Sequence, residues 1–176
     1  METFGNKNIF AFQYEISEKI DRYVYGHLAF WIGGKLIGDY IGYSTISISV
    51  SFLEDFLKQY PRRIYPGSEF KKSTELFFEL YDIFFDENVI IDPIRSQYTN
   101  IFWLNFVGEY SLLDQIGMIL INEPNLKRQR LVWKYFVDSS IEEFFLPYDY
   151  FDKVANDFVE KANAQMKDLG YIRNTN

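Results

Sequence analysis

The sequence predicts an α+β fold, in which a largely antiparallel β-sheet carries about three helices packed on one face. Two observations lead to this fold class. Residues 8–41 contain alternating apolar and polar positions and a Gly-Gly dipeptide, which is typical of β-hairpins. Residues 149–169 repeat apolar residues at helical spacing, which predicts a long C-terminal helix that packs on the sheet.

An antiparallel meander is expected to open the chain. Its three strands are predicted over residues 8–16, 22–32 and 35–41. Gly33 and Gly34 suit a two-residue type I′ turn, because both positions of that turn need positive φ. This turn places Ile32 opposite Lys35 in the register of the hairpin.

Two helices are predicted after the meander, over residues 45–60 and 68–86, where apolar residues recur at helical spacing. Ser51 and Glu54 have the spacing of a capping box at the start of the first helix. Ser68 is expected to cap the second helix, and Phe70 to lie on its apolar stripe.

Further strands are predicted in the second half of the chain, over residues 101–106, 116–122, 128–137 and 141–147. Pro124 and Asn125 favour a hairpin loop between the second and third of these strands. Acidic residues and Pro147 indicate that the last one is an edge strand. Because the chain has no linker and no internal repeat, residues 1–176 are expected to form a single domain.

The charge and the cysteine count exclude several classes of partner and site. The chain has 18 Lys and Arg against 25 Asp and Glu, a formal net charge of −7, which argues against binding to nucleic acid or to an anionic membrane. It has no cysteine, so disulfides, thiol nucleophiles and thiolate metal sites are excluded. Without a signal-like start or a long apolar stretch, the protein is expected to be cytoplasmic.

Catalytic chemistry finds little support in the residues. His27 is the single histidine, and beside Gly26 in a predicted strand it is expected to pack rather than to catalyse. The ligand sets of zinc and calcium sites, the P-loop and the dinucleotide fingerprint are absent from the sequence, so no metal and no cofactor are expected. By elimination, a binding protein is favoured over an enzyme.

Two acidic windows are the candidate partner-binding surface, because large apolar and aromatic residues lie among their carboxylates. Solvated helix faces and loop rims are the simpler interpretation, since acidic surface also serves solubility alone. The candidate residues are Glu75, Glu79, Asp82, Asp86, Glu87, Asp92, Asp138, Glu142, Glu143, Tyr148, Asp149, Tyr150 and Asp152.

The segments "FAFQYEI", "YGHLAFWIGGKLIGDY" and "FLEDFLKQY", within residues 8–60, resemble the small immunity proteins of bacterial polymorphic toxin systems, specifically the family numbered forty-two. This resemblance implies a cytoplasmic non-enzyme, an antitoxin in bacterial competition that binds one cognate toxin domain and blocks it. It supplies no catalytic residues. The residues that match the motif are expected to serve the fold, with the tryptophan in the core; they are Trp31, Gly33, Gly34, Gly38 and Asp39.

The leading hypothesis is therefore an immunity protein that neutralises a toxin, expected to be basic, by stoichiometric contact. One alternative is a carbohydrate-binding or small-ligand protein that uses exposed aromatic rings as stacking platforms. A pocket lined by Trp103, Trp133 and a pair of carboxylates would favour this alternative. Another is a non-catalytic interaction or scaffold domain.

Overall fold

A computed structural model describes residues 1–37, 40–85, 102–104, 116–137 and 140–171, with the backbone alone for 61 and 82–85. The chain divides into two compact units. The first unit comprises Met1–Lys58, Phe106–Asp114 and Tyr150–Asn176, and the second comprises Gln59–Asn105 and Gln115–Asp149.

In the part of the chain that the structure describes, each unit contains one antiparallel β-sheet. The predicted α+β class, the antiparallel pairing, the three α-helices and the long C-terminal helix are confirmed within the described residues. The strands form two sheets, however, where the sequence suggested one. That residues 1–176 form a single domain stays a prediction.

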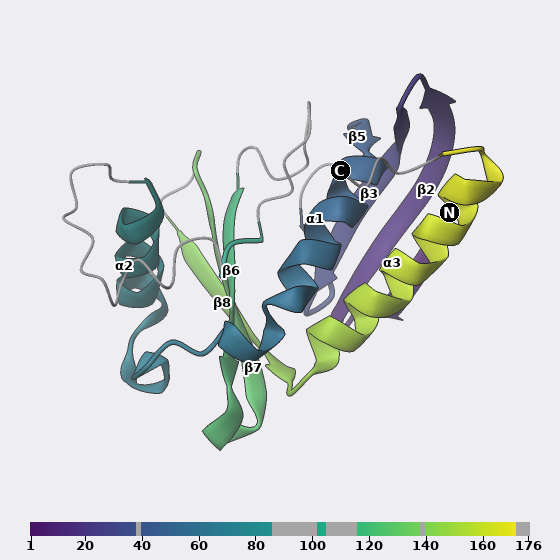
Figure 1. The fold of residues 1–176 in the computed structure, drawn as a ribbon. Coiled ribbons are helices and arrows are strands. Elements are labelled where there is room, and N and C mark those ends of the chain that lie inside the picture. The colour runs from purple at the N-terminus through teal and green to yellow at the C-terminus, as the bar shows by residue number, and fades with distance from the viewer. Residues whose placement is uncertain (38–39, 86–101, 105–115, 138–139, 172–176) are drawn as a thin grey trace. The chain divides into compact units, whose positions relative to one another are not determined.

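The sheet of the first unit has the strand order β1-β2-β3-β4, with β5 paired to β3. Its strands are β1 (Glu2–Asn6), β2 (Phe10–Ile20), β3 (Tyr23–Ile32), β4 (Lys35–Ile37) and β5 (Ser44–Thr45). Helices α1 (Ile46–Lys58) and α3 (Tyr150–Asp168) both pack on this sheet (Figure 1).

The predicted hairpin between β3 and β4 is confirmed in turn and register. Gly33 and Gly34 have φ values of 57° and 83°, as a type I′ turn requires, and Ile32 lies opposite Lys35. Glycine is required at position 26 for steric reasons and not for a turn. A Cβ atom there would collide with the backbone carbonyl of Glu15 on β2, so the close approach of the two strands admits no side chain.

Stacked aromatic rings form the core of the first unit. The ring of Phe158 on α3 stacks on Phe12 with centroids 4.8 Å apart, and meets Tyr14 edge-on at 4.9 Å. Phe151 lies about two turns earlier in α3, and its ring centroid is 5.0 Å from that of Phe10. The apolar stripe predicted for α3 therefore packs on alternate residues of β2, because such residues share one face of a strand. Gly170, with φ 72°, follows the helix in the left-handed conformation that commonly ends one.

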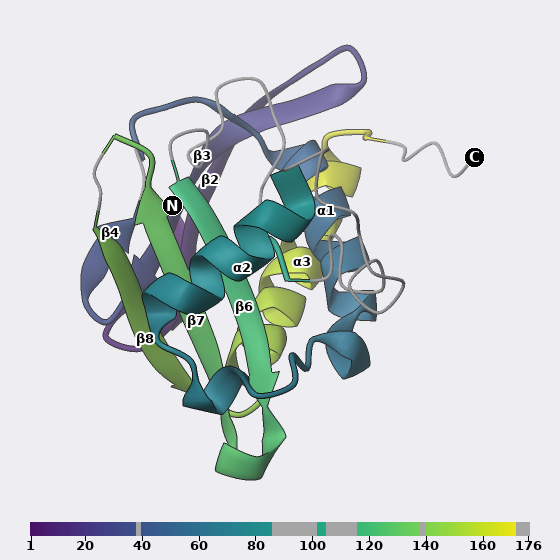
Figure 2. The same cartoon turned by 90° about the vertical axis from the view of Figure 1, so that its left-hand side faces the viewer.

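The sheet of the second unit has the order β6-β7-β8, with β8 at an edge as predicted. Its strands are β6 (Ile116–Glu123), β7 (Arg128–Tyr135) and β8 (Ile141–Pro147). Helix α2 (Ser73–Phe85) lies across one face of this sheet (Figure 2). Leu76, Phe77 and Leu80 of the helix are fully buried in a cluster with Ile119 and Val132.

Short segments complete the second unit. They are the 3-10 turns η1 (Tyr60–Arg62), η2 (Ser68–Phe70) and η4 (Pro124–Leu126). The turn η4 joins β6 to β7, so the predicted hairpin loop is confirmed, and Lys127 at its end has a positive φ. Of the strand predicted over 101–106, residues 102–104 are described, and Trp103 forms an isolated bridge to Ile119.

Three local predictions are wrong. Helix α1 begins at Ile46, so Ser51 lies inside it and cannot start a capping box. Ser68 opens the turn η2 and α2 begins only at Ser73, which leaves Phe70 off the helix and 87% exposed. Trp31 is half-buried and does not join the core. Gly38 and Asp39 of the same motif lie outside the described residues.

Candidate functional site

Helix α2 carries two of the predicted acidic residues in different environments. The Glu75 side chain is 60% exposed and its Oε1 lies 3.5 Å from Lys71 Nζ. Glu79 is more enclosed, because it lies 2.9 Å from Lys71 Nζ and accepts a 2.7 Å hydrogen bond from the Tyr65 hydroxyl. The hydrogen bond to Glu79 is the main reason why the pKa of Lys71 is raised. Glu75 is thus presented to solvent, whereas Glu79 holds the start of the helix.

On β8 the predicted acids point to opposite sides of the strand. Glu142 lies opposite Trp133, and Glu143 lies opposite Val132. Glu143 Oε2 accepts hydrogen bonds from Arg130 at 2.9 Å (Nε) and 2.6 Å (Nη2). Since Arg130 is itself only 3% exposed, this carboxylate neutralises a cation of the interior.

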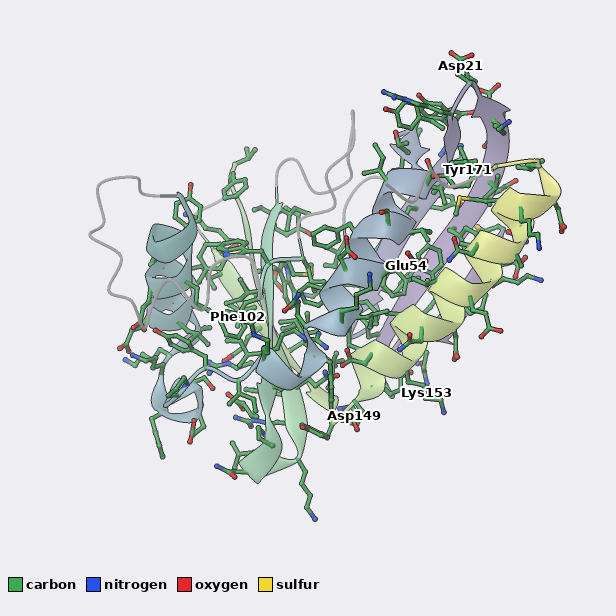
Figure 3. All side chains as sticks on the ribbon, in the orientation of Figure 1. Asp21, Glu54, Phe102, Asp149, Lys153 and Tyr171 are labelled. Atoms are coloured by element: carbon green, nitrogen blue, oxygen red, sulfur yellow. The ribbon has the colours of Figure 1, made fainter. Side chains whose placement is uncertain are left out.

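Tyr148 and Asp149, the second of which is labelled in Figure 3, follow β8 at the end of the second unit. The Tyr60 hydroxyl donates a hydrogen bond to Asp149 Oδ1, and the rings of Tyr60 and Tyr148 lie 6.3 Å apart. Burial, followed by the hydrogen bond to Asp149, raises the pKa of Tyr60. Asp149 remains exposed in spite of this bond.

Tyr150 and Asp152 belong to the first unit, where they begin α3. The Tyr150 hydroxyl accepts a 3.0 Å hydrogen bond from the backbone N–H of Asn6. Asp152 is only 8% exposed. Both residues therefore serve the packing of the helix start.

The structure does not describe the remaining predicted acids. Asp82 lies in α2, but its side chain is outside the description. The others, outside the described residues altogether, are Asp86, Glu87, Asp92 and Asp138. Within the described residues, the candidate set is shared between the two units, and its exposed acids in the second unit are Glu75, Glu143 and Asp149.

A cluster of two arginines around one ring was missed by the sequence reasoning. The guanidinium carbon of Arg128 lies 3.8 Å from the centroid of Phe145, and that of Arg130 lies 5.5 Å from it. Arg128 also donates to the buried Glu123. The spacing of Arg128 and Arg130 could have indicated this cluster. Residues two apart on a strand share one face, so both can contact the same residue of the neighbouring strand β8.

His27 packs against aromatic rings, as predicted. Its ring lies 5.6 Å from Tyr40 and 5.3 Å from Tyr43, and Nδ1 is 3.2 Å from the carbonyl oxygen of Gly42. These rings continue a row along β3 that the sequence reasoning did not identify. We call this row the aromatic face; it consists of Tyr23, Tyr25, His27, Tyr40 and Tyr43.

The tryptophans that would line a carbohydrate pocket in this alternative are not available to a ligand. Trp103 and Trp133 are both buried in the second unit. The cavities bordered by described residues include one of about 370 Å³, lined by residues of β1, β2 and α3, and one of about 110 Å³, lined by residues 64–69 and 122–126. Neither has a tryptophan in its lining. In the described part of the chain, no three His, Asp or Glu side chains are grouped as metal ligands.

The family is shown by a sequence comparison. A family model described as Immunity protein 42 matches residues 1–161. The chain belongs to this family. Its function is therefore that of an immunity protein, which neutralises a toxin, and the resemblance noted in residues 8–60 is confirmed over most of the chain.

Further comparisons concern the fold. CdiI from Burkholderia dolosa AUO158 has a similar structure, with a TM-score of 0.68 and 19% identity over 91% of this immunity protein and 99% of that chain. At this identity the likeness shows the fold alone. A search of curated proteins gives no match. The helices of the described residues include none that could span a lipid bilayer.

Proposed function

We propose that this immunity protein acts in the cytoplasm, where it neutralises one cognate toxin domain by occupying it in a stoichiometric complex and catalyses no reaction itself. The match to Immunity protein 42 over residues 1–161 is the observation that carries the proposal. The environment of His27 supports it, because the only imidazole of the chain packs against two tyrosine rings.

The proposed toxin is basic. The immunity protein has a formal net charge of −7, and a field of this sign accelerates encounter with a cationic partner by about 10- to 1,000-fold at low salt. A toxin that acts on nucleic acid carries positive charge where its substrate binds. An acidic inhibitor can therefore compete for the same surface.

The proposed contact surface includes the acidic positions of the second unit. Glu75 and Asp149 are exposed, and the Glu143 side chain keeps 36% of its surface accessible beside Arg130. Tyr148, next to Asp149, is half-buried and offers a ring to a partner. Rings among charges are typical of the residues that dominate binding energy in protein interfaces.

The proposal is tested with the toxin domain encoded beside the gene for this chain, inactivated by substitution so that it can be purified. Calorimetry should give one molecule of immunity protein per toxin domain, with nanomolar or tighter affinity that weakens as salt is raised. Co-expression with the active toxin should restore growth. Toxin that kills equally with and without this protein, together with no measurable binding, would contradict the proposal.

A further inference from the structure

The aromatic face lies on the side of the first unit's sheet that its helices leave uncovered. In β2, Phe10, Phe12 and Tyr14 point toward Phe151 and Phe158 of α3. Phe12 lies opposite Phe30 and Tyr14 opposite Leu28, so the even-numbered residues of β3 share the helix side. Alternation then places Tyr23, Tyr25 and His27 on the opposite side of the strand.

The rings of the aromatic face form a continuous row. Tyr23 and Tyr25 lie 6.3 Å apart, and Tyr25 stacks on Tyr43 at 6.2 Å. Tyr43 meets His27 edge-on at 5.3 Å, and His27 lies 5.6 Å from Tyr40. Tyr43 is 39% exposed, and the other four members are half-buried.

Two carboxylates stand beside these rings. Glu15 lies opposite His27 and Glu18 opposite Tyr25 in the register of β2 and β3. The Tyr43 hydroxyl donates a 3.0 Å hydrogen bond to Glu18 Oε1. Burial and then the charge of Glu15 raise the pKa of Tyr40, which places the Glu15 carboxylate within electrostatic reach of that ring. The side chain of Glu15 is half-exposed, so its charge also faces solvent.

This combination of groups suits a cation on a protein partner. Aromatic ring faces attract guanidinium and ammonium groups, and a carboxylate at the ring edge adds an ion pair. The chain makes such contacts itself, since the Arg22 guanidinium carbon lies 5.0 Å from the Tyr23 centroid at one end of the row. Solvent-facing positions of an antiparallel sheet are typically polar, whereas tyrosines are enriched in interfaces.

We propose that the aromatic face, together with Glu15 and Glu18, is a contact surface that receives an arginine or lysine side chain of the cognate toxin. This inference rests on the proposed function and adds to it a binding surface on the first unit. Tyr25 and Tyr43 supply the ring faces, and the two carboxylates supply the charge.

The test measures the affinity of full-length variants for the inactivated toxin domain by calorimetry. Tyr43→Ala should weaken binding about tenfold, because it removes the most exposed ring of the row. Tyr43→Phe keeps that ring and should bind within about threefold of the wild type. The double variant Glu15→Gln, Glu18→Gln should weaken binding about tenfold and reduce its dependence on salt.

A matched control removes charge elsewhere. Asp157→Asn with Glu160→Gln changes the net charge by the same amount on exposed positions of α3, and should bind within about threefold of the wild type. The inference is overturned if Tyr43→Ala and the Glu15, Glu18 double variant bind like the wild type. Absence of binding by the wild type itself would instead contradict the proposed function. Unfolding curves of each variant show that the fold is kept, and the glutamine variants test the inference even if Tyr43→Ala does not fold.

Discussion

Arg130 illustrates how one charged residue is held in the interior of the second unit. Its Nη1 donates to the carbonyl oxygens of Ser68 and Lys71 at 2.8 and 3.0 Å, and its other nitrogens donate to Glu143. A buried guanidinium is tolerated only when its donors are satisfied in this way. Arg130 therefore links β7 to β8 and to the turn that precedes α2.

Substitution of Arg130 by methionine should lower the free energy of unfolding by about 3 kcal/mol, because it leaves a carboxylate and two carbonyl oxygens without their donor. Urea unfolding followed by circular dichroism measures the change. Lys72→Met, at an exposed position, is the control and should stay within about 0.5 kcal/mol of the wild type. Equal losses in the two variants would contradict this role of Arg130.

Tyr14 belongs to a chain of side-chain hydrogen bonds in the first unit. Its hydroxyl donates to Gln165 Oε1 at 2.8 Å, and Gln165 Nε2 donates to Glu2 Oε1 at 2.6 Å. Burial, and then the charge of Glu2, raises the pKa of Tyr14. The folded protein thus holds this phenol proton more tightly than the unfolded chain does.

A raised pKa of an acid has a defined consequence for stability. The contribution of the neutral Tyr14 is fully present below about pH 10, the ordinary pKa of tyrosine, and is lost as pH rises above it. The free energy of unfolding should therefore fall in alkaline solution. Tyr14→Phe should show a shallower fall above about pH 10 in urea unfolding. Parallel pH profiles of the two proteins would contradict the assignment to Tyr14.

Helix α3 shows how an element is attached through a few large side chains. Its Phe158 contacts Phe12 and Tyr14 of β2 and lies 6.3 Å from Phe4 of β1, so one ring joins the helix to two strands. Phe158→Ala should lower the free energy of unfolding by about 3–5 kcal/mol, because it leaves a cavity among these rings. Glu160→Ala, on the exposed side of α3, is the control for thermal or urea unfolding. A loss below about 1 kcal/mol would contradict this view of the core.

The same element explains what the sequence could predict. The stripe of α3 and the Gly33-Gly34 hairpin were predictable because their patterns are local and strong. Strand β1 was missed because its five residues include Gly5 and Asn6, which favour turns. The start of α2 was misplaced because Ser68, a good capping residue, serves the turn η2 instead.

The candidate site was predictable only in part, because surface roles depend on partners that lie far apart in sequence. Glu75 and Glu79 lie four residues apart and were both predicted on the acidic face of a helix. Of these two residues, however, only Glu79 accepts a hydrogen bond from the Tyr65 hydroxyl. Asp152 reads as a surface acid in the sequence and is buried in the structure. The aromatic face was missed because Tyr40 and Tyr43 come from the segment after β4 and join β3 through tertiary packing.

At the scale of the whole molecule, the described residues form two antiparallel sheets with their helices, and this scaffold does not by itself define a function. The proposed function is that of a protein that binds a basic toxin and remains bound; the match to Immunity protein 42 and the net charge of −7 support this proposal. Inhibition by binding of this kind requires one immunity protein molecule for each toxin domain. A catalyst would instead inactivate many toxin molecules.

The residual activity of a fixed amount of active toxin domain, measured while the immunity protein is added in small steps, tests this claim most directly. Tight binding predicts that activity falls linearly and reaches zero at one equivalent of immunity protein. Complete loss of activity far below one equivalent would show turnover and contradict the account, as would activity that persists at a large excess.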